Sequence, residues 1–359
     1  MKKVIIALSG GIDSAVAAAL LKGEGVDELR SSSLFANARV FDVIGVFMRL
    51  FPGVKNKTSE ARARKVAKIL KIPFRIFNLE KEFKKIVIDC FLKESKGGLT
   101  PNPCVICNKE IKFGLFLEKA LKLKADYVAT GHYARIVEDR SRIFKLCKGK
   151  DKEKDQSYFL WRLNQKQLKK VLLPIGDYVK KEVKNLARKF KLSFLVKVPK
   201  SQEICFINGK LEVFLKKQLG AKPGKIVDLK GKILGEHQGL WFYTIGQRKG
   251  IGFSGGPYYV LEKDLKNNLL IVDKNEKNLY KEELIVKKAN WVSGKKPKFP
   301  LKLTVKIRYR HLAVQAVIVN ELKPGTLRLK FKRPQRAVTP GQSAVFYQGQ
   351  DLLGGGIIY

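Results

Sequence analysis

The amino-acid sequence predicts an α/β protein with an N-terminal doubly wound parallel sheet, a small β-rich central domain and a C-terminal antiparallel β-barrel. Three observations support this fold class. Short apolar runs alternate with amphipathic stretches up to residue 206, glycines punctuate short β-type runs over 207–283, and apolar and basic residues alternate over 284–359. A chain of 359 residues is long enough for two or three such domains.

The first predicted domain, residues 1–206, shows a βαβ rhythm, which is typical of a parallel sheet with helices on both faces. We expect strands at 4–8, 40–48, 74–79 and 127–130. We expect amphipathic helices at 14–22, 59–70, 82–93, 110–122 and 180–191.

In the C-terminal domain, 284–359, the alternation is strict, for instance over 301–308 and 327–332. Successive side chains of a strand point to opposite faces, so these strands carry a stripe of Lys and Arg on the outward face. A solvated face would carry both signs of charge. The single sign favours contact with phosphate.

The charge of the whole chain points the same way. The sequence has 73 Lys plus Arg against 32 Asp plus Glu, a formal net charge of +41. Such an excess favours a polyanionic partner, because binding releases counterions. Nucleic acid is therefore the predicted partner, and a uniformly lysine-rich proteome is the alternative explanation.

The compartment is predicted from cysteine use and from apolar runs. Five cysteines are odd in number and too sparse for a disulfide framework, which fits a reducing cytoplasm. Ser9 and Gly10 end the first apolar run after five residues, so it is no export signal. No apolar run approaches 18 residues, so we expect no membrane span.

The first βα turn, at residues 7–14, has the pattern expected of a phosphate-binding loop. Gly10 and Gly11 let backbone N–H groups approach an anion, Ser9 and Ser14 supply hydroxyls, and the following helix adds its positive N-terminal end. A Gly-Gly turn alone also serves packing in many α/β folds. The full string SGGIDS is more specific, because it resembles the PP-loop of the ATP pyrophosphatase superfamily, whose members adenylate a substrate.

A second cluster, TPNPCVICN at 100–108, precedes a helix that we expect to open at Lys109. Cys107 would then lie near a helix N-terminus, where the dipole, Lys109 and Lys112 depress a thiol pKa. A zinc site is the alternative for this CxxC. It lacks a second CxxC or paired histidines, so we predict no metal site.

The third cluster surrounds Cys205 with Lys197 and Lys200. Cys90 and Cys147 stand in apolar helix and strand contexts and are predicted to be core residues. The candidate functional cysteines are therefore Cys104, Cys107 and Cys205.

Taken together, eight strings in order across nearly the whole length resemble the bacterial tRNA-specific 2-thiouridylases. They are SGGIDS, TPNPCVICNKEIKF, ATGHYARI, KDQSYFL, SQEICFI, GLWFYTIGQRKGIGF, IRYRH and RAVTPGQSAVFY. The resemblance implies ATP-dependent exchange of oxygen for sulfur at C2 of the wobble uridine in tRNAs for Lys, Glu and Gln. It also implies ATP with Mg2+, a cysteine persulfide, a persulfide-donating sulfur carrier protein and a reductant.

The resemblance further assigns roles to single residues. ATP would contact Ala7, Leu8, Ser9, Gly10, Gly11, Ile12, Asp13, Ser14, Met48 and Gly131. The target base would face Asn102, Pro103 and Cys104. The tRNA would contact His132, Lys154, Asp155, Gln156, Arg308, Tyr309 and Gln342. Cys205 would carry the persulfide sulfur and Cys107 would be the nucleophile that resolves it, leaving a transient disulfide.

The chemistry is consistent with that assignment. The O2 of uracil is a poor leaving group, so adenylation by ATP turns it into one before a sulfur nucleophile attacks C2. A loop base flips out of its stack at little cost.

The sequence departs from the family pattern at three places. Cys104 stands where some relatives carry Asp, so the general base is unassigned, and Lys200 stands where Asp is common. The insertion from Gly23 to Arg39 has no functional explanation. Three cysteines near an ATP site also allow an iron–sulfur cluster as an alternative. The alternative functions are a PP-loop adenylating ligase or amidotransferase for a small molecule, and a non-catalytic RNA-binding protein.

Overall fold

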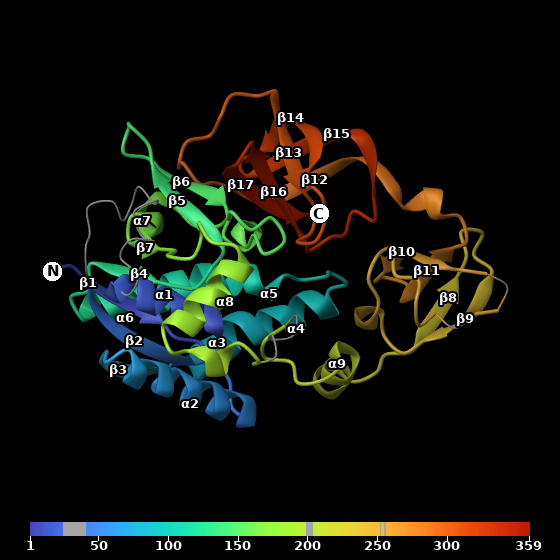
Figure 1. Ribbon diagram of the computed structural model, residues 1–359. Helices are drawn as coiled ribbons and strands as arrows, with labels where there is room; N and C mark the ends of the chain where they lie inside the picture. Colours follow the sequence, from blue (N-terminus) through green and yellow to red (C-terminus); the bar gives the residue numbers. More distant parts are fainter. Residues whose placement is uncertain (24–40, 199–203, 252, 255) are drawn as a thin grey trace.

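The computed structural model describes residues 1–23, 41–198, 204–251, 253–254 and 256–359. It confirms the predicted fold class: a parallel sheet with helices, a small central sheet and a C-terminal antiparallel barrel (Figure 1). Residues 24–39 of the predicted insertion and Lys200 lie outside the described residues. Within the described ranges, no helix is long and apolar enough to cross a membrane.

The N-terminal sheet has five parallel strands in the spatial order β3-β2-β1-β4-β7. They are β1 (Lys3–Ala7), β2 (Asp42–Arg49), β3 (Phe74–Asn78), β4 (Tyr127–Ala129) and β7 (Val171–Leu172). Strands β2 and β3 extend from one side of β1, and β4 and β7 from the other. The switch in strand order, where open α/β sheets bind ligands, therefore lies at the carboxyl end of β1.

Helices cover both faces of this sheet. One apolar layer contains α1 (Ile12–Lys22), α2 (Val54–Ile69) and α8 (Lys180–Lys189), and the other contains α6 (Phe116–Lys122) and α7 (Gln165–Leu168). Helix α2 begins at Val54, ahead of the predicted start at Ser59. Five small or aliphatic residues of α1, Ala15–Ala19, are fully covered because both the sheet and α8 pack against this helix.

Two longer helical runs contain a π-helical segment. The first consists of α3 (Glu80–Phe83), η2 (Lys84–Ile88) and α4 (Asp89–Lys96), and the second of α5 (Pro103–Ile106), η3 (Cys107–Leu115) and α6. The short helices are η4 (Ser157–Phe159), η5 (Ser193–Leu195), α9 (Leu211–Leu219), η6 (Leu240–Phe242) and η7 (Glu276–Leu279).

The central sheet has the order β10-β11-β8-β9 and mixes parallel and antiparallel pairs. Its strands are β8 (Gly224–Val227), β9 (Ile233–His237), β10 (Tyr259–Asp264) and β11 (Leu269–Asp273). Figure 1 shows this sheet at the right, with α9 between it and the N-terminal domain. Phe214 of α9 packs against Phe91 and Phe206, so α9 anchors the central domain to the first.

The C-terminal barrel closes because β12 pairs with both β15 and β17. Its strands are β12 (Tyr280–Trp291), β13 (Leu301–Lys306), β14 (Val314–Lys323), β15 (Thr326–Arg336), β16 (Ser343–Gln348) and β17 (Asp351–Ile358). On β15 the predicted alternation holds, since Leu329 and Phe331 are buried whereas Arg328, Lys330 and Lys332 are exposed.

The barrel also recruits a hairpin from the N-terminal segment. Strands β5 (Ala134–Glu138) and β6 (Phe144–Lys148) extend the barrel sheet beyond β17, through pairing of β6 with β17. Figure 1 shows this green hairpin beside the red barrel strands. Both strands lie within the first predicted domain, residues 1–206, and neither was predicted as a strand. The pairing of β6 with β17 therefore connects the N-terminal domain to the C-terminal barrel.

Candidate functional site

The nucleotide loop, which we define as residues 7–14, connects β1 to α1 at the switch in strand order. Gly10 has a φ of 72°, and a Cβ on it would lie 2.2 Å from the Ser59 carbonyl oxygen of α2. Arg62 donates from Nε to the Gly10 carbonyl at 2.9 Å. Only glycine fits at Gly10, because the positive φ and the backbone of α2 both exclude a side chain.

Two serines hold the loop from within. Ser14 Oγ accepts from the Ser9 backbone N–H at 3.1 Å, donates to the Gly11 carbonyl at 3.1 Å, and lies 3.1 Å from Ser9 Oγ. In the described residues no side chain caps α1 at Gly11. The first N–H groups of α1 and its positive end therefore make a site suited to phosphate.

Asp13, in the first turn of α1, accepts hydrogen bonds from two side chains that were not predicted as site residues. Tyr133 donates from Oη to Asp13 Oδ1 at 2.7 Å, and Lys180 Nζ reaches the same oxygen at 2.5 Å. The Lys180 side chain is 17% exposed. A lysine thus reaches the loop from the start of α8. Tyr133 stands in the ATGHYARI string, whereas Lys180 stands in an ordinary lysine run and gave no local signal.

Gly131 and Met48 are the two predicted ATP contacts outside the nucleotide loop, and this role stays a prediction. A Cβ on Gly131 would lie 2.6 Å from the backbone nitrogen of Ser14, so the chain after β4 touches the start of α1. Met48 stands near the end of β2 and packs against two apolar clusters, one of which also contains Cys107. Met48 therefore connects the nucleotide side of the sheet with the cysteine region.

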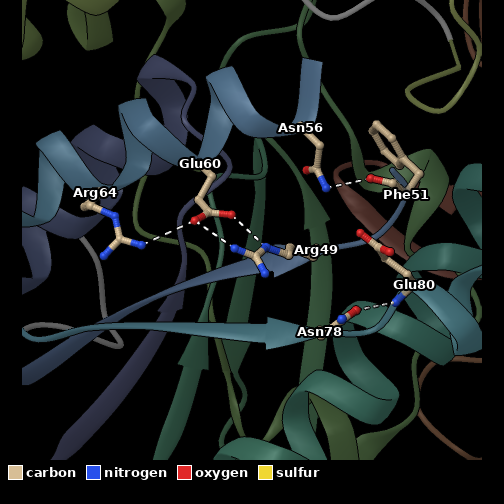
Figure 2. A network of polar contacts seen from close by, with 7 residues as sticks. All are labelled: Arg49, Phe51, Asn56, Glu60, Arg64, Asn78 and Glu80. Atoms are coloured by element: carbon tan, nitrogen blue, oxygen red, sulfur yellow. Dashed lines mark hydrogen bonds and ion pairs between the residues drawn. The ribbon is translucent and has the colours of Figure 1, made fainter. Parts of the chain in front are cut away.

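A separate polar network lies between α2 and the end of β2 (Figure 2). Arg49, at the end of β2, donates to both oxygens of Glu60 at 2.8 and 3.1 Å, and Arg64 donates to Glu60 at 3.3 Å. These residues border a hollow of about 960 Å3. The hydrogen bond from Arg49 lowers the pKa of Glu60. Arg49 is therefore neutralised by Glu60 rather than directed at the nucleotide loop.

The cysteine centre, which we define as Cys104, Cys107, Cys205 and Lys112, lies on and beside the second helical run. This helix begins at Pro103, and the expected opening at Lys109 is wrong. Proline suits a first helical turn, where its missing N–H costs nothing. Cys107 consequently lies inside the helix and not at its N-terminus.

The expected depression of the Cys107 pKa is also wrong. Burial raises the pKa of Cys107 to about 12 and that of Cys104 to about 11. The positive charge of Lys112 lowers both pKa values but does not offset burial. Lys109 takes no part, since its Nζ donates to Gln167 at 2.8 Å.

Cys205 joins the other two cysteines from a distant part of the chain. It packs against the apolar cluster that contains Cys107 and Phe206. The charge of a Cys205 thiolate raises the pKa of both Cys104 and Cys107. All five cysteines lie in the described ranges and are thiols.

The described residues do not arrange three Cys, His, Asp or Glu side chains to hold a metal ion. Cys147 is buried, as predicted, and donates to Asp351 at 3.3 Å. Cys90 is only half-buried and donates to Glu94 at 3.7 Å. Neither cysteine belongs to the centre.

A buried histidine supports Lys112. His132 Nδ1 lies 2.7 Å from Thr130 Oγ1, and His132 Nε2 lies 3.5 Å from Lys112 Nζ. Burial lowers the pKa of His132 well below its usual value, and the charge of Lys112 lowers it further. A neutral imidazole can accept from the lysine, so His132 fixes the position of the cation beside the thiols.

The barrel holds the loop that precedes Cys104. Gln342 donates from Nε2 to the Thr100 carbonyl at 2.8 Å, and the Thr100 N–H donates to the Pro340 carbonyl at 2.9 Å. The Tyr158 hydroxyl hydrogen-bonds the Asn102 side chain and donates to the Ser343 carbonyl at 3.0 Å. The barrel therefore sets the position of the predicted base-facing residues.

The predicted tRNA-contact residues of the KDQSYFL string mostly make internal bonds. Asp155 is buried and accepts from Gly149 N, Ser157 N and Ser157 Oγ at 3.0 to 3.1 Å. Gln156 accepts from the Tyr133 N–H at 3.0 Å. Lys154 is half-buried beside them. Asp155 and Gln156 thus hold the segment that carries Tyr133.

Two further predicted tRNA contacts, Arg308 and Tyr309, follow β13. Arg308 donates to the Arg336 carbonyl at 2.8 Å. The Tyr309 ring packs on Phe159 with centroids 4.4 Å apart, and burial, followed by the charge of Asp155, raises the pKa of its hydroxyl. Tyr309 thus connects the barrel to η4 of the first domain.

The central domain borders the cysteine centre through η6. Trp241 and Phe242 pack against the apolar cluster that contains Cys107. Trp241 Nε1 is buried, and within the part of the chain that the structure describes it has no hydrogen-bond partner. The central domain therefore packs against the cluster that contains Cys107 and Cys205, whereas the barrel bonds the loop before Cys104.

Models of three domain families match the chain end to end. They are the tRNA methyl transferase HUP domain at residues 2–209, the tRNA methyl transferase PRC-barrel domain at 212–274 and the aminomethyltransferase beta-barrel domain at 281–358. Among solved structures, the U34-tRNA thiolase NcsA from Methanococcus maripaludis with its [4Fe-4S] cluster is 19% identical. It aligns with a TM-score of 0.35 over 56% of this chain and 60% of that chain, a match too distant to inform the site.

Curated relatives match at full length. The tRNA-specific 2-thiouridylase MnmA of Halothermothrix orenii is 44% identical over 377 residues, covering 100% of this chain and 99% of the relative. The tRNA-specific 2-thiouridylase MnmA 2 of Thermoanaerobacter sp. is 43% identical over 372 residues, covering 99% of this chain and 97% of the relative. This chain therefore belongs to the tRNA-specific 2-thiouridylase family.

Proposed function

We propose that this protein is an ATP-dependent sulfurtransferase that replaces O2 of the wobble uridine with sulfur in tRNAs for Lys, Glu and Gln. The names of its relatives support thiolation of tRNA uridine. Within this chain, the observation that carries the proposal is the packing of Cys205 against the apolar cluster that contains Cys107, against which Met48 at the end of β2 also packs. The net charge of +41 suits a tRNA substrate.

The first step activates the base. ATP binds on residues 7–14 with Met48 and Gly131 at its edges, and the uridine O2 attacks the α-phosphate while pyrophosphate leaves. Lys180, already beside Asp13, supplies positive charge near the phosphates. Asp13 is a hard oxygen ligand of the kind Mg2+ takes, and a bound Mg2+ would neutralise phosphate charge.

The second step transfers sulfur. A sulfur carrier protein loads Cys205 as a persulfide, whose terminal sulfur attacks C2 and displaces AMP. The Cys107 thiolate then attacks the Sγ of Cys205, so that the sulfur–sulfur bond breaks, thiouridine leaves and a Cys107–Cys205 disulfide remains. A reductant returns both thiols. We place this reaction in the cytoplasm, where thiols stay reduced.

The remaining predicted residues orient the tRNA. Asn102, Pro103 and Cys104 face the flipped base, with Asn102 held by Tyr158. The residues proposed to serve tRNA binding are His132, Lys154, Asp155, Gln156, Arg308, Tyr309 and Gln342. Their contacts support two ways of serving tRNA binding. The buried Asp155 holds its own chain segment in position, whereas the half-buried Lys154 can contact phosphate directly.

The test is nucleoside mass spectrometry of tRNA after incubation with ATP, an enzymatic persulfide source and the protein. Cys107→Ala and Cys205→Ala should each abolish 2-thiouridine, because each removes a sulfur that the transfer needs, while both variants still bind ATP. Cys90→Ala, which alters a cysteine outside the centre, is the matched control and should keep full activity. Thiouridine at the wild-type level from either of the first two variants would contradict the proposal.

A further inference from the structure

Cys104 and Cys107 have the Cα separation at which two cysteines can form a disulfide. They stand three residues apart on one helix, and Ile106 and Cys107 both have helical dihedral angles. In an α-helix the Cα atoms of residues i and i+3 are about 5 Å apart and their side chains share a face. That separation lies inside the range of roughly 4.4 to 6.8 Å that disulfides span.

The three thiols of the cysteine centre are not equivalent. Cys107 is 7% exposed, whereas Cys104 and Cys205 are each partly exposed. Cys107 shares an apolar cluster with Cys205 and a helical run with Cys104. A disulfide between Cys107 and Cys205 would therefore have a third thiol, Cys104, one helical turn away on the same helix.

We propose that Cys104 is a second resolving thiol, which attacks the Sγ of Cys107 in the Cys107–Cys205 disulfide. This inference rests on the proposed function. The Cys104 Sγ–Cys107 Sγ bond forms, the Cys107 Sγ–Cys205 Sγ bond breaks, and Cys205 leaves as a thiolate that takes up the proton lost by Cys104. Thiol–disulfide exchange moves no net electrons, so this step needs no added oxidant or reductant.

Without this exchange, Cys205 cannot accept the next sulfur until its disulfide with Cys107 has been reduced. With the exchange, Cys205 becomes a thiol again and accepts the next sulfur, while the oxidation is held by the Cys104–Cys107 pair. A dithiol reductant then acts on that pair through the partly exposed Cys104. Lys112 serves both helix thiols, because its charge lowers the pKa of each.

The experiment is a single turnover without reductant. Protein loaded with persulfide is desalted, mixed with tRNA and ATP, quenched with acid and N-ethylmaleimide, and digested with trypsin. Both helix cysteines fall in peptide 97–109, and Cys205 falls in peptide 201–210. Wild type should yield an internal disulfide in 97–109 and a maleimide-labelled 201–210. Cys104→Ser and Cys104→Ala should instead yield 97–109 cross-linked to 201–210, with ATP binding retained.

A second measurement follows reloading with labelled sulfur. After the turnover, wild type should again accept about one sulfane sulfur per protein, and both Cys104 variants less than about a tenth of that, because their Cys205 stays in a disulfide. A wild-type digest dominated by the cross-linked peptides would overturn the role of Cys104 while leaving the proposed function intact. Absence of thiouridine from every sample, wild type included, would overturn the proposed function and the inference with it.

Discussion

The nucleotide loop and the cysteine centre differ in how the chain assembles them. The loop uses contiguous residues, 7–14, fixed by the Ser9 and Ser14 hydrogen bonds and by close backbone contact with α2. The centre combines one helix with Cys205, the central domain packs against it, and the barrel bonds the loop before Cys104. The comparison indicates that the loop is ready to bind an anion as it stands, whereas the centre depends on the packing of three domains.

The two regions also differ in charge state. At the loop, Lys180 and Asp13 form a close ion pair. At the centre, burial raises the pKa of Cys104 and Cys107 to about 11 and about 12, so both are thiols at neutral pH. The loop therefore holds charges of both signs in the resting protein, whereas the centre has the cation Lys112 and acquires a negative charge only when a thiol loses a proton.

The largest expected effect tests the rigidity of the loop. Gly10→Ala places a Cβ 2.2 Å from the Ser59 carbonyl oxygen at a φ of 72°, which should lower the free energy of unfolding by about 3 kcal/mol. ATP-dependent thiolation should fall more than about a hundredfold, since a displaced loop misplaces the phosphates. Denaturant unfolding and single-turnover assays measure the two effects.

Gly11→Ala is the matched control for this prediction. Gly11 has a φ of −102°, and its added Cβ would meet only Ser9 Oγ at 3.4 Å. We expect a change in unfolding free energy below about 1 kcal/mol. Equal destabilisation by the two alanines would show that the loop is not held by α2 in the way described.

The second effect tests the charge at the cysteine centre. Lys112→Met removes the cation that lowers the pKa of Cys104 and Cys107, so both pKa values should rise. One pKa unit reduces the thiolate about tenfold, and single-turnover thiolation at pH 8 should fall by about that factor. Cys205 also acts on both thiols, Cys104 acts on Cys107, and His132 touches Lys112.

The pH dependence of the thiolation rate shows in which direction the charge of Lys112 acts. In wild type the rate should rise about tenfold per pH unit between about pH 7 and 9, because both thiols titrate well above that range. Lys109→Met is the control, since Lys109 bonds to Gln167 and does not contribute to either thiol pKa. An identical loss of rate in both variants would argue against a charge effect of Lys112.

The same contrast explains which features the sequence could predict. The loop was predictable because its glycines and serines are neighbours and their conformations follow from local chemistry. The reach of Lys180 from α8 and the pairing of β6 with β17 were not, because both depend on tertiary packing of distant segments. The pKa of Cys107 was misjudged for a related reason, since its burial by Phe83, Phe206 and their neighbours has no local signal.

The smallest effect tests the contact between the barrel and the loop that precedes Cys104. Gln342→Ala removes the hydrogen bond to the Thr100 carbonyl, a loss of about 1 kcal/mol that should slow thiolation about threefold to fivefold through a less ordered base-facing loop. The affinity for ATP should stay unchanged, because neither Gln342 nor Thr100 belongs to the nucleotide loop. Gln348→Ala, at an exposed end of β16, is the control and should keep the wild-type rate. If Gln342→Ala weakened ATP binding and thiolation equally, the barrel would be stabilising the whole first domain rather than positioning the loop at the cysteine centre.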